Sequence, residues 1–245
     1  MPSVLHSMLV ELFHTRPALA AELLTESAGV GVAGGAWASR GCRLGSETFG
    51  ATQLPEHHAD AVVLVGEPVA AAIVVEVQLR ADPLKQRSWP VYVTGLWARH
   101  GCPVYLLVVC LSEPTARFCE QPILLGHPGF ELRPVVVGPE RVVAVEDPAQ
   151  AAVRPELAVL SALAHGGRAG RRMATGSARD PGDSARAARC AVAAAEGLLT
   201  LPDQRRYAYL DLLLSALGAA ARRALEEWMS QQYEYQSKLF RDLMK

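Results

Sequence analysis

Apolar residues return at every third or fourth position between residues 5 and 24, which is the spacing of one face of a helix. Pro17 lies inside this stretch and lacks the amide hydrogen that a helix interior needs. The pattern therefore predicts either two helices or one kinked helix in the first part of the chain.

The middle of the chain has the pattern of an α/β domain. Residues 60–65 and 69–79 are β-branched apolar runs, separated by the turn signal Gly66-Glu67-Pro68. Residues 83–99 carry apolar positions at helical spacing, and residues 104–110 form another apolar run. We expect a hairpin, a helix and a buried strand in that order.

The last third of the chain is predicted to be helical, because apolar residues return at helical spacing after Pro155. Residues 166–190 differ, since they hold six arginines and almost no large apolar residue. Such a segment is typical of a mobile linker or surface insertion, or of a basic arm that follows a phosphate backbone. We therefore expect a first domain over residues 1–165, this linker, and a helical region over residues 191–245.

Composition narrows the class of protein. The chain has 245 residues, of which 50% are hydrophobic and 20% charged, and its formal net charge is −1. This composition is sufficient for a large buried core, and extensive disorder is not expected. The near-zero charge gives no globally basic surface, although a local basic patch could still bind nucleic acid.

The sequence has no segment typical of membrane insertion or secretion. Its apolar runs are far shorter than the roughly 20 residues that span a bilayer, and Glu11 and His14 interrupt the N-terminal stretch. The five cysteines are widely spaced and form no CxxC motif, so neither a disulfide framework nor a zinc ribbon is expected. We expect a cytoplasmic protein with no membrane partner.

Two acidic residues interrupt the apolar runs of the predicted hairpin. Asp60 begins the first run and Glu76 lies near the end of the second. If the turn is symmetric about Pro68, the two acids lie opposite each other with Cβ atoms roughly 5 Å apart. Carboxylates at that separation repel each other unless a cation lies between them. Oxygen ligands of this kind suit Mg²⁺ or Mn²⁺.

Gln78 follows Glu76 by two residues and therefore shares its face of the strand. The arrangement depends on the register, because a slip of one residue would put the two acids on opposite faces. A purely structural alternative is that Asp60 caps a turn while Glu76 pairs with an arginine such as Arg80 or Arg87.

An aspartate, a hairpin and then Glu76-Val77-Gln78 resemble the signature of the PD-(D/E)XK nuclease superfamily, with glutamine in the place of its lysine. The variant and the order of elements are similar to the recombination-promoting nuclease (Rpn), or transposase-like, branch. Residues 87–92 resemble the helix after the motif in that branch, and residues 161–167 and 233–237 are similar to the C-terminal halves of its high-GC bacterial members. The resemblance covers most of the first domain.

The resemblance implies a restriction-endonuclease-like mixed sheet flanked by helices, with a C-terminal helical extension. It also implies metal-dependent hydrolysis of DNA phosphodiester bonds, in recombination, mobile-element or defence functions. Asp60 and Glu76 would hold Mg²⁺ or Mn²⁺ with the Val77 carbonyl as a third ligand, and Gln78 would orient the water or the phosphate. The superfamily often adds an acid from the leading helix, for which Glu11 is the first candidate.

Glu22 is the second candidate for that acid. The implied partner is nucleic acid, with DNA favoured, and Lys85 and Arg87 on the helix after the hairpin are expected to meet its backbone. In the assumed register His58 faces Gln78 and could contact substrate. No nucleotide cofactor is expected.

Three further interpretations stay open. Gln78 cannot supply the positive charge of the usual lysine, so the chain could be a catalytically inactive nuclease-fold module that binds nucleic acid or protein. The apolar stripe of the last helices suits either a core face or a homodimer seam. Residues 29–34 match the GxGxxG motif, but without the preceding strand that a dinucleotide-binding site requires.

Overall fold

The contacts within the computed structural model divide the chain into two units, Met1–Val143 and Ala144–Lys245, and each is described by itself. The boundary lies before residue 165, the predicted end of the first domain. Residues 181–190 of the predicted linker are helical, whereas its first part lies outside the described residues. The structure describes residues 4–28, 41–46, 48–49, 57–167 and 181–243.

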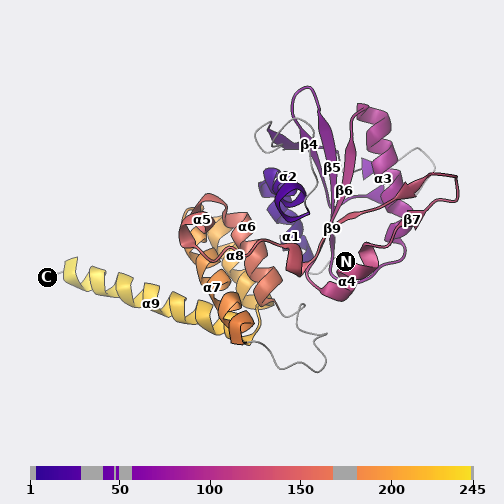
Figure 1. Ribbon diagram of the computed structural model, residues 1–245. Helices are drawn as coiled ribbons and strands as arrows, with labels where there is room; N and C mark the ends of the chain where they lie inside the picture. Colours follow the sequence, from indigo (N-terminus) through magenta and orange to yellow (C-terminus); the bar gives the residue numbers. More distant parts are fainter. Residues whose placement is uncertain (1–3, 29–40, 47, 50–56, 168–180, 244–245) are drawn as a thin grey trace. The chain divides into compact units, whose positions relative to one another are not determined.

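The first unit is built on a five-stranded mixed sheet (Figure 1). β4 runs antiparallel to both β1 and β5, whereas β6 and β9 continue the sheet in parallel. The predicted α/β class with a mixed sheet is therefore confirmed. In sheet order the strands are β1 (Cys42–Leu44), β4 (Ala61–Val65), β5 (Ala71–Gln78), β6 (Val104–Cys110) and β9 (Val135–Val137). Two short ladders pair β2 (Thr48–Phe49) with β3 (His57–His58), and β7 (Ile123–Leu124) with β8 (Glu131–Leu132).

Helices flank both sides of this sheet. α1 (Val4–Thr15) and α2 (Ala18–Glu22) lie on one side and α3 (Lys85–His100) on the other (Figure 1). The predicted interruption at Pro17 is confirmed, since Pro17 caps the start of α2. A π-helical turn over Leu23–Ser27 continues α2, and α4 (Glu113–Cys119) connects β6 to the following segment.

The hairpin of β4 and β5 has the predicted register. Val65 pairs with Ala71, and each step away from the turn keeps the pairing symmetric until Ala61 meets Val75. Gly66 has a φ of +82°, a left-handed conformation that favours glycine at this turn. The ladder ends there, one residue short of Asp60, and Asp60 lies close enough to Glu76 for its charge to act on that carboxyl group.

Both β4 and β5 are buried along their whole length. Strands covered on both faces in this way read as continuous apolar runs, which explains why the two runs were recognisable in the sequence. Glu76 and Gln78 are therefore polar residues inside a hydrophobic core. On their face of the sheet the core contains Val62, Val74, Val108, Trp89, Tyr92 and Leu96.

The second unit is helical. Its core is formed by apolar side chains that include Leu157, Leu163 and Leu225. Leu217, Ala221 and Leu225, from the apolar stripe noted in the sequence, are buried inside this unit. None of the helices that the structure describes has the length and apolarity needed to cross a bilayer. The helices are α5 (Pro148–Val153), α6 (Pro155–Gly166), α7 (Pro181–Leu198), α8 (Asp203–Ala216) and α9 (Ala219–Leu243).

Candidate active site

Asp60 lies immediately before β4, at the point where the hairpin ladder ends. Its Oδ2 accepts a hydrogen bond from the Val77 N–H at 2.8 Å. The carboxylate therefore satisfies a backbone N–H of β5 that would pair with a backbone carbonyl if β4 were longer. The N–H and C=O of one strand residue point towards the same neighbouring strand. The Val77 carbonyl is therefore directed to the side of the strand on which Asp60 lies.

Helix α1 contributes two histidines to Asp60. His6 Nε2 lies 3.3 Å from Asp60 Oδ2, and His14 Nε2–H donates to the Asp60 backbone carbonyl at 3.0 Å. Neither histidine was predicted as a site residue from the sequence. Their spacing could have indicated a shared polar face, because two residues eight positions apart lie within about 80° of each other around a helix. The rest of α1 is mostly apolar.

Glu76 is fully buried, and its two oxygens have different surroundings. Oε2 accepts hydrogen bonds from Lys85 Nζ at 2.7 Å and from Gln78 Nε2 at 3.2 Å. Among the residues that the structure describes, no hydrogen-bond partner meets Oε1. The Trp89 indole N–H lies near enough to favour the ionised carboxylate without the geometry of a hydrogen bond. Oε1 therefore keeps an unused acceptor in a buried position.

The electrostatics of Glu76 follow from this position. Burial, followed by the negative charge of Asp60, raises the pKa of Glu76 to about 7, against the opposing effects of Lys85 and Trp89. Burial by itself lowers the pKa of Lys85, but the Glu76 carboxylate more than offsets this, so the lysine pKa is raised overall. The pair thus combines a lysine whose pKa is raised with a buried carboxyl group whose pKa lies near neutral pH.

The other predicted residues are placed as follows. Gln78 shares the face of Glu76, as expected. Lys85, predicted to meet nucleic acid, is the ion-pair partner of Glu76, rather than either arginine considered above. Arg87 is exposed two residues further along α3, where it points to a different side of the helix. His58 is exposed and belongs to the β2–β3 ladder, so the expected pairing with Gln78 does not form.

The structure does not bring the predicted helix acids to this site. The Glu11 side chain is 61% exposed; it accepts a hydrogen bond from Thr15 Oγ1 at 3.2 Å and lies 3.8 Å from His14 Nδ1. Glu22 is buried on α2, with both oxygens bound by the Arg16 guanidinium. Leu9 and Leu12 face the core from α1, and this orientation directs Glu11 to solvent.

Within the described ranges no cluster of three or more His, Cys, Asp or Glu side chains is arranged to hold a metal ion. The ligand set implied by the resemblance is different, because it contains two carboxylates and the backbone carbonyl of Val77. A magnesium ion usually completes such a set with water. The observation that fits a cation is Oε1 of Glu76, a buried acceptor without a hydrogen-bond partner.

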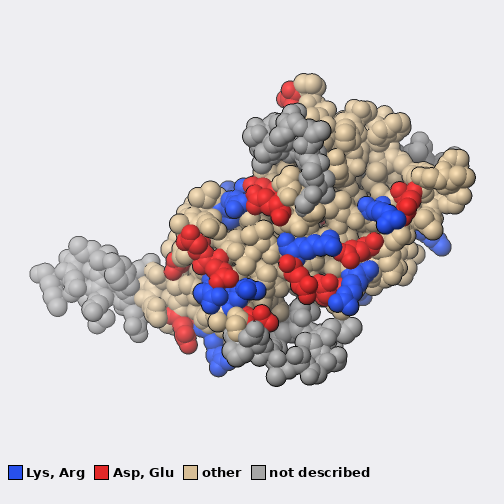
Figure 2. All heavy atoms as spheres, viewed as in Figure 1, with Lys and Arg blue, Asp and Glu red and all other residues tan. Residues whose placement is uncertain are grey.

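Charge is mixed on the visible surface. Figure 2 shows basic and acidic side chains interspersed on the face in view. Among the described residues of the first unit, ion pairs join Arg133 to Glu131 at 2.8 Å and Arg141 to Glu120 at 3.0 Å. A broad basic field is therefore not a feature of this face, and contacts to a nucleic-acid backbone would have to be local.

The GxGxxG segment, residues 29–34, and the first part of the arginine-rich segment, residues 168–180, lie outside the described residues. The site is thus formed by the open end of the β4–β5 hairpin, away from its turn, together with α1 and the start of α3.

Comparisons of the chain with protein-family models, with curated proteins and with solved structures gave no match in any of the three searches.

Proposed function

We propose that the chain is a Mg²⁺- or Mn²⁺-dependent nuclease that hydrolyses DNA phosphodiester bonds on a restriction-endonuclease-like fold. The observation that supports this most is Glu76, a fully buried carboxylate with an unpartnered oxygen, set beside Asp60 at the end of a hairpin. Lys85 and Gln78 offset the cost of burying Oε2, but the buried Oε1 has no hydrogen bond to offset its own desolvation. A functional reason for this arrangement is therefore expected.

The residues have distinct roles in this proposal. Asp60 and Glu76 would hold the divalent ion, with the Val77 carbonyl as the third protein ligand. A bound ion of this kind lowers the pKa of the attacking water and stabilises charge on the phosphate. Gln78, whose amide lies 3.2 Å from Glu76 Oε2, orients the water or a phosphate oxygen. The water oxygen bonds to phosphorus and gives a proton to solvent, the bond to the leaving sugar oxygen breaks, and that oxygen takes up a proton from solvent.

The wider role belongs to the same proposal. The Glu76-Val77-Gln78 motif and the order of elements resemble the recombination-promoting nuclease branch, so we place the activity in recombination, mobile-element or defence functions. The substrate in this proposal is DNA, as the resemblance favours, and the exposed Arg87 on α3 contacts its backbone.

A second candidate function is a catalytically inactive module that keeps the fold and binds nucleic acid or protein. One observation favours it, because Lys85 and Gln78 both donate hydrogen bonds to one oxygen of Glu76, as in a structural ion pair. In that case the C-terminal helices recruit the partner or a second copy of the chain.

The test is cleavage of supercoiled plasmid by the purified chain, with Mg²⁺, with Mn²⁺ and with EDTA. We expect metal-dependent cleavage that is lost in Asp60→Asn and in Glu76→Gln. Glu67→Gln is the matched control, since Glu67 is exposed in the turn of the same hairpin. A rise in melting temperature on adding Mn²⁺, lost in the two site variants, checks the ion without relying on catalysis.

Three outcomes would contradict the proposal. A folded chain without cleavage and without a metal-dependent thermal shift would favour the binding module. Cleavage that survives both site variants would place the activity elsewhere. Preferential cleavage of RNA of matched length would replace DNA as the substrate.

A further inference from the structure

The proposed reaction lacks a positive charge at position 78, where the nuclease motif has its lysine. Gln78 donates a neutral amide hydrogen bond to Glu76 Oε2 at 3.2 Å. Lys85 Nζ donates to the same oxygen at 2.7 Å. Two donors from different elements therefore converge on one carboxylate oxygen, and only the second carries a charge.

The segment between β5 and α3 holds Lys85 in this position. Asp82 Oδ1 accepts a hydrogen bond from the Leu84 N–H at 2.9 Å, and the Asp82 carbonyl accepts from the Lys85 N–H at 3.2 Å. Trp89, four residues further along the same face of α3, is 1% exposed and anchors the helix in the core. The lysine therefore begins an anchored helix and is not a mobile surface residue.

The lysine is also accessible. Its side chain is 25% exposed, whereas Glu76 is fully buried. A partly exposed side chain of this kind keeps its ion pair with Glu76 and still borders the surface from which a ligand would approach.

We infer that Lys85 is a catalytic residue that supplies from α3 the positive charge that the nuclease motif otherwise places at position 78. This inference rests on the proposed nuclease function. The ammonium group contacts the scissile phosphate, or the water that attacks it, and stabilises the negative charge that develops there. It stays protonated throughout and transfers no proton.

The test moves the positive charge from position 85 to position 78. Lys85→Gln removes it, and the double variant Gln78→Lys with Lys85→Gln returns it at the motif position. We expect Lys85→Gln to lower the single-turnover cleavage rate about a hundredfold while KM and the Mn²⁺-induced thermal shift change little. The double variant should recover at least about tenfold of that loss, as expected for a restored electrostatic contact.

Two further variants separate catalysis from folding. Lys85→Arg keeps the charge on a bulkier group, and it should cleave faster than Lys85→Gln at the same melting temperature. Arg99→Gln, at the other end of α3, is the matched control and should cleave like the wild type. A rescue by charge at a different position would not occur if Lys85 had only a structural role.

The inference is overturned if Lys85→Gln cleaves within about threefold of the wild type, or if the double variant, folded and binding Mn²⁺, cleaves no faster than Lys85→Gln. Failure of the proposed function looks different. In that case the wild type itself shows no metal-dependent cleavage, and the Lys85 role fails with it.

Discussion

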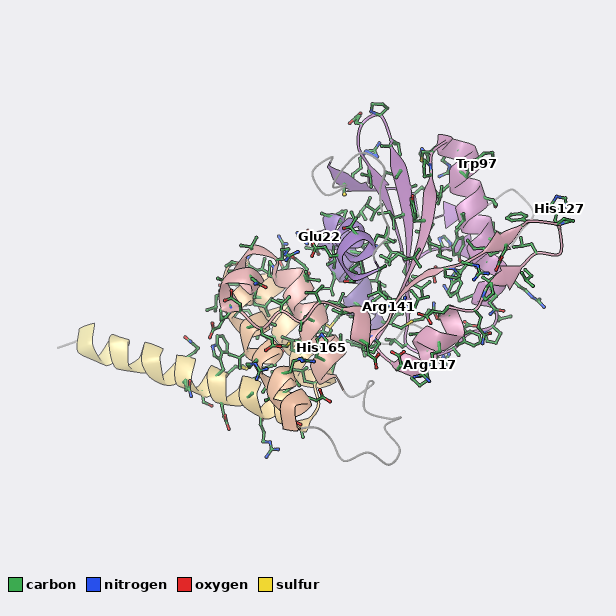
Figure 3. All side chains as sticks on the ribbon, viewed as in Figure 1. Glu22, Trp97, Arg117, His127, Arg141 and His165 are labelled. Carbon is green, nitrogen blue, oxygen red and sulfur yellow. The ribbon has the colours of Figure 1, made fainter. Side chains whose placement is uncertain are left out.

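Two buried glutamates of the first unit have different surroundings. Glu22, labelled on α2 in Figure 3, receives both terminal nitrogens of Arg16, at 2.8 and 2.5 Å, so each of its oxygens has a partner. Glu76 on β5 receives Lys85 and Gln78 on one oxygen, and the other oxygen has no hydrogen-bond partner among the described residues.

The difference lies in the partner cations. A guanidinium group is planar and satisfies both oxygens of a carboxylate at once, whereas an ammonium group acts as a point charge. The Glu22 pair is therefore complete as a structural contact. The Glu76 pair keeps an acceptor for a further ligand. Burial alone therefore does not separate the two glutamates, whereas the hydrogen bonding of their carboxylate oxygens does.

The largest expected effect is on cleavage. Glu76→Gln should lower the rate about a thousandfold or more, because the variant loses the charge that holds the divalent ion. Glu22→Gln should stay within a few-fold of the wild type if it folds. Single-turnover plasmid cleavage in Mg²⁺ measures both. Equal losses in the two variants would show that the two glutamates do not differ in function.

The free energy of unfolding should respond in the opposite order, with a larger loss when Glu22 loses its partner cation than when Glu76 does. Arg16→Ala leaves Glu22 buried without its cation and should lower the free energy of unfolding by about 3 kcal/mol. Lys85→Met should cost less, about 1 kcal/mol, because a carboxyl group with a raised pKa can take up a proton instead. Urea unfolding at pH 7 in EDTA measures both values. The comparison fails if Lys85→Met costs as much as Arg16→Ala.

A pH series should sharpen the contrast at Glu76. Its pKa is raised from 4.5 to about 7 in the folded chain, so the folded state keeps a proton that the unfolded state releases between these values. The stability of the wild type relative to Glu76→Gln should therefore be highest below pH 4.5, fall as the pH rises to about 7, and then level off. Urea unfolding of metal-free protein across this range is the measurement. A constant difference would contradict the raised pKa.

The smallest effect concerns nucleic-acid affinity. Arg16 is bound to Glu22, whereas Arg87 is exposed on α3, so of these two arginines Arg87 is the one that the proposed function assigns to a phosphate contact. In a Glu76→Gln background, Arg87→Ala should weaken DNA binding a few-fold and reduce the salt slope by about 1. Arg99→Ala is the control, some 18 Å further along the helix. An unchanged salt slope would remove Arg87 from the proposed interface.

The continuous apolar runs of the buried strands made much of the sheet predictable. The run over residues 104–110 is β6, and the turn at Gly66 and Pro68 set the hairpin register that was expected. Pro17 interrupts the first helix for a local reason, the missing amide hydrogen. Asp60 and Glu76 could be chosen as a pair because strand alternation and a symmetric turn are properties of the local sequence.

Only the tertiary structure decided which residues surround that pair. His6 and His14 reach Asp60 from a helix more than forty positions earlier in the chain, as the 46-residue separation of the His14 bond shows. Lys85 reaches Glu76 because the loop after β5 turns α3 back onto the sheet. Glu11 was chosen by its position in the leading helix, but the rotation of that helix directs it to solvent. Local sequence specifies periodicity and turns, whereas the orientation of packed helices depends on contacts across the whole core.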